Sequence, residues 1–464
     1  MNRPWQTTII VVLVLLLTAC GSSGSGSSGA EAETYNSDVQ KVSDISGTVR
    51  VALAGWQLEN GMDAVTGQET TGFNQYVQDT FKKMYPNITL EVTQVPWENA
   101  QAKQRALLMS GDVDVLYTGG AFASQYYNEG LLRNIDDLIK QDKEFDPSIY
   151  LQGIWNNSYS TRSPDGKNQY GIPAVLGKRV TIYDKQLFDE WGVEPLSEVP
   201  TPEEILEKAK KMTGTNPKTG EQNYGLYFAG NSLNQATLVA LSYYFDAKGG
   251  EGTLDKPADI QWELNTPGMV KAVQWLGEAA KLAPPAFVNG NGAENFGLDK
   301  NNVAMVLDNS GTTIMSEYRA NKDDALLQRY IPVMNMGPDG TGWVAVDPII
   351  MAKKAENPEA AWAVMKFLAS YDTQKWAYLN FDMTPTLTNA DFVESNNGFI
   401  KNAMKMAEIS KPTLMDEADP FYNSEIVPAV NGYISEVANG GSPDVQALLD
   451  RLQSRAEQWS ASQK

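Results

Sequence analysis

Histidine is absent from this chain of 464 residues, and cysteine occurs once, as Cys20. Without histidine, neither a Ser-His-Asp triad nor a Cys-His pair can form, and a zinc site with histidine ligands is excluded. A single cysteine excludes a disulfide within the chain, so burial of apolar side chains has to stabilise the fold. The chain is long enough for such a core, and its length predicts two domains or more.

Positive charge is scarce as well, with 37 Lys and Arg against 57 Asp and Glu and a formal net charge of −20. Nucleic-acid binding needs basic residues that neutralise phosphates, so the composition argues against it. The same deficit gives no sign of docking on anionic lipid. We interpret the acidic balance as a contribution to solubility.

An apolar run from Ile9 to Leu17 follows Arg3 and is shorter than the roughly 20 residues of a membrane span. A charged start, a short apolar core and small residues after it are typical of a secretory signal. Leu17-Thr18-Ala19-Cys20 resembles a bacterial lipobox, which implies that Cys20 becomes the lipidated N-terminus. The alternative is a signal-anchor helix with an incidental cysteine. The segment predicts a lipid-anchored protein on the extracytoplasmic face of the cell membrane.

A flexible tether is predicted from residue 21 to 46, because glycine, serine and acidic residues dominate this stretch. Ordered structure is expected from Gly47 onward. The ordered part is rich in aromatic residues, since the whole chain has 11 Trp, 20 Tyr and 14 Phe. Aromatic faces suit the apolar faces of sugar rings, although most of these rings are expected to fill cores.

Strand and helix patterns alternate after the tether. Strands are predicted at 49–53, 88–92 and 113–117, with helices at 73–85 and 98–109. This order predicts an α/β fold with a mostly parallel sheet. Ligands of such sheets bind beyond the carboxyl ends of the strands, which points to Trp56 and to Gly119 and Gly120.

The second half of the chain continues the pattern. Thr201 is a good helix N-cap before Pro202, and further helices are predicted from residues 266 and 357. Residues 179–183 and 303–307 are predicted strands. The glycine-rich residues 249–252 are predicted to form a loop.

A series of short motifs occurs in order along nearly the whole mature chain. The motifs are Tyr85-Pro86-Asn87-Ile88, Gly111-Asp112-Val113-Asp114-Val115, Tyr170-Gly171-Ile172-Pro173, Tyr183-Asp184-Lys185, Asn302-Val303-Ala304-Met305 and Asn357-Pro358-Glu359-Ala360-Ala361-Trp362. In this order they resemble family 1 extracellular solute-binding proteins, which are the ligand-capturing subunits of ABC importers. Asp184 and Val113 depart from the family, which usually has asparagine and proline there.

The resemblance implies an α/β, two-lobe periplasmic-binding-protein-like (type II) fold with hinge strands between the lobes. The chain is expected to cross between lobes near residues 173–178, 297–300 and 342–347. The N-terminal lobe is then predicted to comprise residues 47–173 and 301–342, and the C-terminal lobe residues 178–298 and 345–464.

Ligand contacts are implied at strand ends and loops between the lobes. Trp56 could instead belong to the core, Gly119 and Gly120 to a plain turn, and Lys178 to a solvated hinge. The residues implied are Trp56, Gln57, Gly119, Gly120, Gly177, Lys178, Asn234, Gln235, Asn309, Ser310, Gly311, Trp343, Asp347 and Tyr422.

The resemblance also implies binding with lobe closure rather than catalysis. A carbohydrate, expected to be an oligosaccharide, would stack on aromatic rings, and Asp347 would make strong charge-assisted bonds to hydroxyls. A ligand touching both lobes favours the closed state, which would dock on an ABC permease. No catalytic residue, cofactor or metal ligand is predicted, and the protein is expected to be a monomer. The alternatives are a carbohydrate sensor, a glycosidase with two carboxylates, or a polyamine or peptide ligand.

Overall fold

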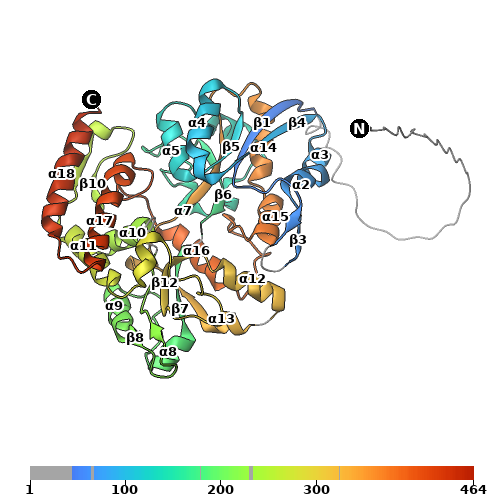
Figure 1. The fold of residues 1–464 in the computed structure, drawn as a ribbon. Helices are drawn as coiled ribbons and strands as arrows, with labels where there is room; N and C mark the ends of the chain where they lie inside the picture. The colour runs from blue at the N-terminus through green and yellow to red at the C-terminus, as the bar shows by residue number, and fades with distance from the viewer. Residues whose placement is uncertain (1–43, 64–66, 178, 229–233, 323, 464) are drawn as a thin grey trace, which may run out of the picture.

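The computed structural model describes residues 44–63, 67–177, 179–228, 234–322 and 324–463. Two main β-sheets, each with its own helical cover, make up this part of the chain (Figure 1). The first sheet has five strands in the order β4-β1-β5-β14-β6, and the second has three in the order β12-β7-β13. Within these residues no helix combines the length and the apolar character needed to cross a membrane. The predicted signal segment, Cys20 and most of the predicted tether lie outside the described residues.

The first sheet is parallel in its first half and mixed beyond it. β1 (Gly47–Ala54) pairs in parallel with β4 (Ile88–Val95) and β5 (Val115–Tyr117). β14 (Val346–Met351) runs antiparallel to both β5 and β6 (Gly171–Leu176).

Helices α2 (Phe73–Asp79), α3 (Phe81–Met84), α4 (Ala100–Ser110), α5 (Gly120–Asn128), α14 (Pro358–Leu368) and α15 (Tyr371–Phe381) cover the first sheet. The helix predicted at 73–85 is interrupted at Thr80, whose φ of −124° is not helical. The core between sheet and helices is apolar and fully buried at residues such as Leu53, Val115, Ile349 and Val364.

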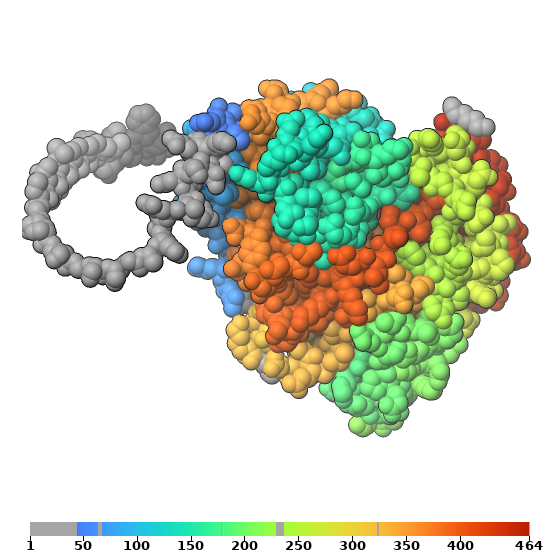
Figure 2. All heavy atoms as spheres, turned by 180° about the vertical axis from the view of Figure 1, so that it is seen from behind, coloured from blue at the N-terminus to red at the C-terminus, as the bar shows by residue number. Residues whose placement is uncertain are grey.

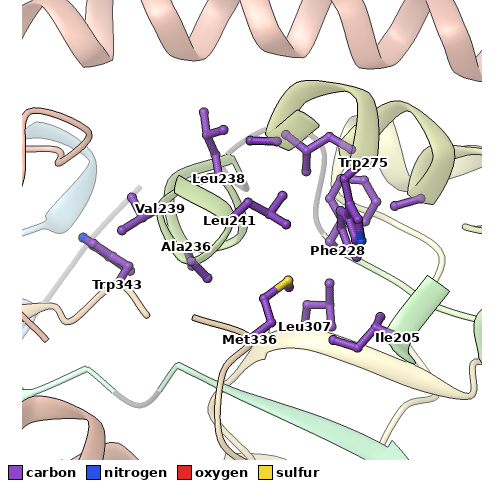
Figure 3. Close-up of a cluster of buried hydrophobic side chains, with 14 of the residues drawn as sticks. Ile205, Phe228, Ala236, Leu238, Val239, Leu241, Trp275, Leu307, Met336 and Trp343 are labelled. Atoms are coloured by element: carbon purple, nitrogen blue, oxygen red, sulfur yellow. The ribbon is translucent and has the colours of Figure 1, made fainter. Parts of the chain in front are cut away.

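The second sheet comprises β7 (Val180–Asp184), β12 (Met305–Asn309) and β13 (Tyr330–Val333), and both neighbours run antiparallel to β7. The larger helices beside it are α9 (Pro202–Lys211), α10 (Asn234–Tyr244), α11 (Pro267–Ala280), α16 (Gly398–Ile409), α17 (Val427–Ala438) and α18 (Val445–Ala461). Thr201 caps α9 as predicted, because its side chain accepts from the backbone N–H of Glu204. Figure 3 shows part of the core, where Leu241 of α10, Trp275 of α11 and Leu307 of β12 converge.

Shorter elements complete the described fold. They are α6 (Asp136–Gln141), α7 (Gln152–Trp155), α8 (Lys185–Trp191), α12 (Thr312–Asn321) and α13 (Ala325–Arg329), and the paired strands β2 (Gly61–Met62) with β3 (Glu69–Thr70), β8 (Gly214–Thr215) with β9 (Gln222–Asn223), and β10 (Gly249–Glu251) with β11 (Gln261–Glu263). The loop predicted at 249–252 is therefore wrong, since most of it is strand β10. Glycine content misled that prediction, because glycine also occurs where two backbones approach closely.

The predicted division of the second half into lobes is wrong for two segments, whereas α16, α17 and α18 lie in the predicted lobe. β12 lies within the predicted first-lobe segment 301–342, yet it pairs with β7 in the second sheet. β14 lies within the predicted second-lobe segment 345–464, yet it is inserted between β5 and β6 of the first sheet. α14 and α15, which follow β14, pack into the first core as well. A strand pattern identifies a strand but not its partner, so the assignment could not come from periodicity.

The crossing predicted near residues 297–300 is wrong too. The backbone carbonyls of Leu298 and Asp299 accept bonds from Tyr330 Oη (2.6 Å) and Arg329 Nη1 (2.9 Å), which hold this segment against the second sheet. A passage that was not predicted follows Thr384 and leads to α16, which packs against β13 and β7.

Asp184 has a structural reason to differ from the family's asparagine. Its buried carboxylate receives two bonds from Arg329, Nε to Oδ1 at 2.9 Å and Nη2 to Oδ2 at 2.7 Å. It also caps α8 and accepts from Asn301 Nδ2 at 2.8 Å. One carboxylate therefore joins β7, α8, α13 and the residues before β12.

We expect Asp184→Asn to lower the free energy of unfolding by about 3–5 kcal/mol, because it leaves the largely buried Arg329 guanidinium without a counter-charge. Urea unfolding monitored by fluorescence would measure the change. Glu207→Gln is the matched control: it breaks the exposed pair with Lys211 and should cost less than about 1 kcal/mol. Equal losses in the two variants would contradict the role given to Asp184.

Candidate functional site

Three chain passages between the sheets lie side by side. The Gly177 N–H donates to the Ala345 carbonyl at 2.8 Å, and the Leu176 N–H donates to the Thr384 carbonyl at 3.0 Å. A Cβ atom at Gly177 would come within 2.7 Å of the Ala345 Cβ, so glycine is needed there for close packing. Such bonded segments are where hinge bending between two lobes is absorbed.

A second contact joins the two bodies away from these passages. The backbone N–H groups of Gln152 and Gly153, at the start of α7, donate to the carboxylate of Glu408 in α16 at 3.1 and 2.9 Å. Figure 2 shows these segments, teal and orange-red, meeting on the rear face. A carboxylate at a helix N-terminus is favoured by the helix dipole.

The strand ends of the first sheet bring aromatic and acidic side chains together. The Tyr117 hydroxyl, at the end of β5, donates to Asp347 Oδ2 at the start of β14 at 2.8 Å. A Cβ atom on Gly119 would lie 3.9 Å from Asp347 Oδ1 and 3.7 Å from the Trp97 ring. Trp97, which follows β4, is 42% exposed. An exposed ring thus stands beside a carboxylate and an open glycine backbone.

Arg179, which precedes β7, and Asp308, in β12, form an ion pair on the second sheet. Arg179 Nη1 lies 3.4 Å from Asp308 Oδ2, and its guanidinium carbon stands 5.3 Å from the centroid of the Trp343 ring. Asp308 has a left-handed φ of 60° at a register irregularity of β12. The irregularity lies between Val306 and Asn309, and Asn309 pairs with Val180 beyond it.

A third acidic group comes from the turn before α17. Asp416 accepts from the Ala418 N–H and Asp419 from the Phe421 N–H, each at 2.9 Å, and Glu417 lies between them in sequence. Burial raises the pKa of Tyr422 well above its usual value, and the charges of Asp416, Glu417 and Asp419 raise it further. The ring of Tyr422 is therefore close to these acids.

Asp308, Asp347, Asp416, Glu417 and Asp419 are together called the acidic compartment, because charges from both bodies act on Glu417. Burial, together with the charges of Asp416 and Asp347, raises the pKa of Glu417 to about 8, and Arg179 opposes the shift. The charge of Asp308 also raises the pKa of Glu417. Asp347 of the first sheet and Asp308 of the second therefore both act on Glu417.

Burial raises the pKa of the other four carboxyls as well. The pKa of Asp308 is about 7, with Arg179 opposing the shift, and that of Asp347 is about 6, with the Tyr117 bond opposing it. The pKa of Asp416 is about 6 and that of Asp419 about 7. These groups are consequently part protonated near neutral pH. Within the described residues no cluster of three or more acids, histidines or cysteines is arranged to hold a metal ion.

A groove of about 950 Å³ also lies between the two bodies, beside the turn that leads to α17. It is lined on one side by residues around α5 and α6, such as Tyr127 and Arg133, and on the other by Leu254, Pro420 and Trp459. None of the residues predicted to contact ligand lines it.

The predicted site residues fall into two groups. Asp347, Gly119, Trp343 and Tyr422 lie around the acidic compartment, although Tyr422 and Trp343 are largely buried. Figure 3 shows Trp343 at the edge of the second core, beside Val239 of α10. Gly177 packs closely against Ala345, where two of the passages between the sheets lie side by side.

Trp56 belongs to the core of the first body. It is 2% exposed, and its ring centroid lies 5.3 Å from Phe73, 5.2 Å from Tyr117 and 5.6 Å from Trp376. Trp56 therefore packs against the Tyr117 ring within the core. Gln57 donates to the Glu59 carbonyl and to Thr70 Oγ1, which fixes the loop after β1.

The remaining predicted residues serve local structure or lie outside the description. A Cβ atom at Gly120 would come within 2.5 Å of Ser160 Oγ, so α5 begins in close packing. Asn309 accepts from the Gly311 N–H, and Ser310 bonds to the Thr312 hydroxyl, so both shape the start of α12. Lys178 and the side chains of Asn234 and Gln235, which begin α10, lie outside the described part.

Several residues of the compartment were not predicted. Trp97 follows the carboxyl end of β4, so the rule that selected Trp56 would also have selected it. Asp308 directly precedes the predicted Asn309, and Arg179 follows the predicted Lys178. Nothing in the sequence marks Asp416 and Glu417, because their turn reaches the compartment only through the packing of α16 and α17.

We expect the free energy of unfolding to fall as the pH rises from about 5 to about 8. A folded pKa of about 7 for Asp308 and about 8 for Glu417 lies above the unfolded value of about 4. The native state then binds more protons, so its stabilisation is complete below the unfolded pKa and is lost as the pH rises through the folded pKa. Each proton contributes at most about 1.4 kcal/mol per pH unit.

Urea unfolding at a series of pH values would measure this slope. Glu417→Gln should reduce it, whereas Glu263→Gln, at an exposed position of β11, should leave it unchanged. A stability that is flat or rises over this range would contradict the shared acidic compartment.

Comparison with known proteins agrees with this architecture. A family model described as bacterial extracellular solute-binding protein matches residues 65–375. A protein of Brucella abortus (strain 2308), named only as a binding protein, is 24% identical over 338 residues, which are 70% of this chain and 73% of that protein.

Two solved structures share the fold. The sugar-binding protein MalE from Xanthomonas citri superposes with a TM-score of 0.69 at 17% identity, covering 90% of this chain and 98% of that one. The ABC substrate-binding protein Lmo0181 from Listeria monocytogenes, solved with cycloalternan, gives a TM-score of 0.64 at 18% identity, covering 89% and 99%. The predicted α/β two-lobe fold is confirmed. Because the family match spans well over half of the sequence, the chain belongs to the bacterial extracellular solute-binding proteins.

Proposed function

We propose that this protein captures a carbohydrate between its two lobes and delivers it to an ABC permease. The observation that supports this most directly is the exposed Trp97 ring at the strand ends of the first body, where it lies with Asp347 beside Gly119 and Tyr117 holds the Asp347 carboxylate. Aromatic faces receive the apolar faces of sugar rings, and carboxylates accept bonds from hydroxyls. The sugar-binding and cycloalternan-bound structures of the same fold agree with this ligand class.

Capture would work through closure. A ligand that bonds to Asp347 on one side and to Asp308 or Glu417 on the other is held fully only when the lobes are closed, so it shifts the equilibrium toward that state. The parallel passages at Gly177, Ala345 and Thr384 would absorb the bending. The closed form would then be the one that the permease recognises.

The mature protein should melt at a higher temperature with one class of sugar in a panel of oligosaccharides and polyols, because a ligand of the native state stabilises it. Trp97→Ala should weaken that binding by about tenfold, or roughly 1.4 kcal/mol, with little change in stability, since the ring is half exposed. Isothermal titration calorimetry would measure the affinity.

Leu379→Ala, at a side chain 61% exposed on α15, is the control and should leave affinity unchanged. Products should be followed in the same samples, since a carboxyl with a raised pKa near another carboxylate meets a requirement of glycosidases. Turnover would replace the binding role with an enzyme, and a panel without any effect would remove the carbohydrate.

We also propose that Cys20 anchors the protein by a lipid on the extracytoplasmic face of the cell membrane. The lipobox-like residues before it and the glycine- and serine-rich residues after it support this. Cys20→Ala should release the protein from the membrane fraction and abolish incorporation of labelled palmitate. Retention of the label in that variant would place the lipid elsewhere.

A further inference from the structure

We propose that Arg319 is a positioning residue for lobe bending, because it fixes the point at which the last of the three passages crosses between the bodies. Its partners are Tyr378, Asp382, Glu394 and Asn397, and these residues together are called the Arg319 cluster. This inference goes beyond the proposed function and does not depend on the identity of the ligand.

Arg319 lies on α12 and binds three partners at once. Its Nη1 donates to Asp382 Oδ1 at 2.9 Å, its Nε to Glu394 Oε1 at 3.0 Å and its Nη2 to Tyr378 Oη at 2.7 Å. Its guanidinium carbon also stands 4.9 Å from the centroid of the Tyr378 ring. The side chain of Arg319 is 19% exposed and that of Asp382 is 6% exposed. Charge-assisted bonds at such partly buried positions are stronger than the bonds of exposed ion pairs.

The Tyr378 hydroxyl connects the other members of the cluster. It accepts from Arg319 Nη2 and from Asn397 Nδ2, the latter at 3.1 Å, and it donates to Glu394 Oε2. Tyr378 and Asn397 are both fully buried. A hydroxyl has one hydrogen to donate and two lone pairs to accept with, so every bonding position of this hydroxyl is occupied.

Bonds within the cluster run from one body to the other. α12 packs into the second core through Met315, whereas α15 packs into the first core through Trp376. Figure 1 shows these two helices next to each other where the bodies meet. Asn397 belongs to the second body as well, since it caps α16 by accepting from the Ile400 N–H. The cluster is therefore a third contact between the bodies, besides the bonded passages and the Glu408 contact on the rear face.

The last of the three passages stays on the first body for much of its length. The Thr388 N–H donates to the Ile149 carbonyl at 2.8 Å, and Phe392 packs against the first core. A Cβ atom on Gly398 would lie 2.9 Å from the proline of β13, so the chain has reached the second body there. The crossing therefore occurs within residues 393–397, where two members of the cluster lie.

Fixing this crossing restricts how the lobes can move. The first two passages are bonded to each other at Gly177 and Ala345 and have to bend together. The last passage is irregular at its crossing, and a free crossing would let the bodies twist as well as bend. The Arg319 cluster ties it to helices of both bodies, so the remaining motion is bending about the line of the passages. A narrow range of arrangements in the empty protein also means that less conformational entropy is lost when a ligand holds the lobes in one of them.

Distances between spin labels on the two bodies measure this range without any ligand. The full mature chain would carry Cys20→Ala together with Lys103→Cys on α4 and Lys271→Cys on α11, which are exposed positions. Since Cys20 is the only native cysteine, the labels attach at these two positions alone. Double electron–electron resonance then gives the distribution of the distance between the bodies.

Two variants of the cluster should broaden that distribution. Arg319→Gln should widen it about twofold, because glutamine is uncharged and lacks the fork of donors that holds three partners. Tyr378→Phe removes only the central hydroxyl and keeps the buried ring, so it should widen the distribution while the protein stays folded. Arg455→Gln is the matched control: it breaks the pair with Glu425 inside the second body and should leave the width unchanged.

The other outcomes overturn the proposal. An equally narrow distribution in both cluster variants would show that the cluster stabilises the fold without restricting the lobes, whatever stability urea unfolding reveals. Equal broadening in Arg455→Gln would mean that loss of any ion pair loosens the molecule. If Arg319→Gln fails to fold, the width in Tyr378→Phe decides. Failure of every sugar to bind would refute the proposed function and leave this test unaffected, because no ligand takes part in it.

Discussion

The insertion of β14 between β5 and β6 is the constraint on which the rest of the structure depends. These backbone ladders bring a strand from the second half of the chain into the sheet built by the first half. They place Asp347, at the start of β14, against the Tyr117 hydroxyl. The same insertion forces the chain to pass between the sheets again, and the passages at Gly177 and Ala345 become bonded neighbours. The site and the hinge thus follow from one pairing.

The pairing of β14 with β5 and β6 could not be predicted from the sequence. The positions of β1, β4, β7, α9 and α14 followed from local patterns, because caps and alternation act over a few residues. Partners hundreds of residues apart leave no such trace, so segment 301–342 and the part of 345–464 that holds β14, α14 and α15 were predicted in the wrong lobes. The family resemblance predicted the architecture correctly, whereas it placed β12 and β14 in the wrong sheets.

Prediction of the site failed for a related reason. The rule that ligands bind beyond strand ends led to Trp56 and Gly119, which both lie at such ends. The rule does not say which way a side chain points, and Trp56 turns into the core to support Tyr117. Asp347 was predicted from the resemblance, whereas Asp416 and Glu417 reach the compartment only through packing of the last helices.

Buried acids occur in two kinds of environment in this molecule, which shift their pKa values in opposite directions. Burial alone would raise the pKa of Asp114, yet the bonds from Arg50 bring it below the usual value. Asp184 likewise has its arginine, and each pair ties distant segments together. Burial raises the pKa values of Asp308, Asp347 and Glu417, and among the described residues Arg179 opposes the shift in all three. The carboxyls with raised pKa values therefore lower the stability of the native state as the pH rises, whereas Asp114, whose pKa is lowered, stabilises it above the ordinary pKa of an aspartate.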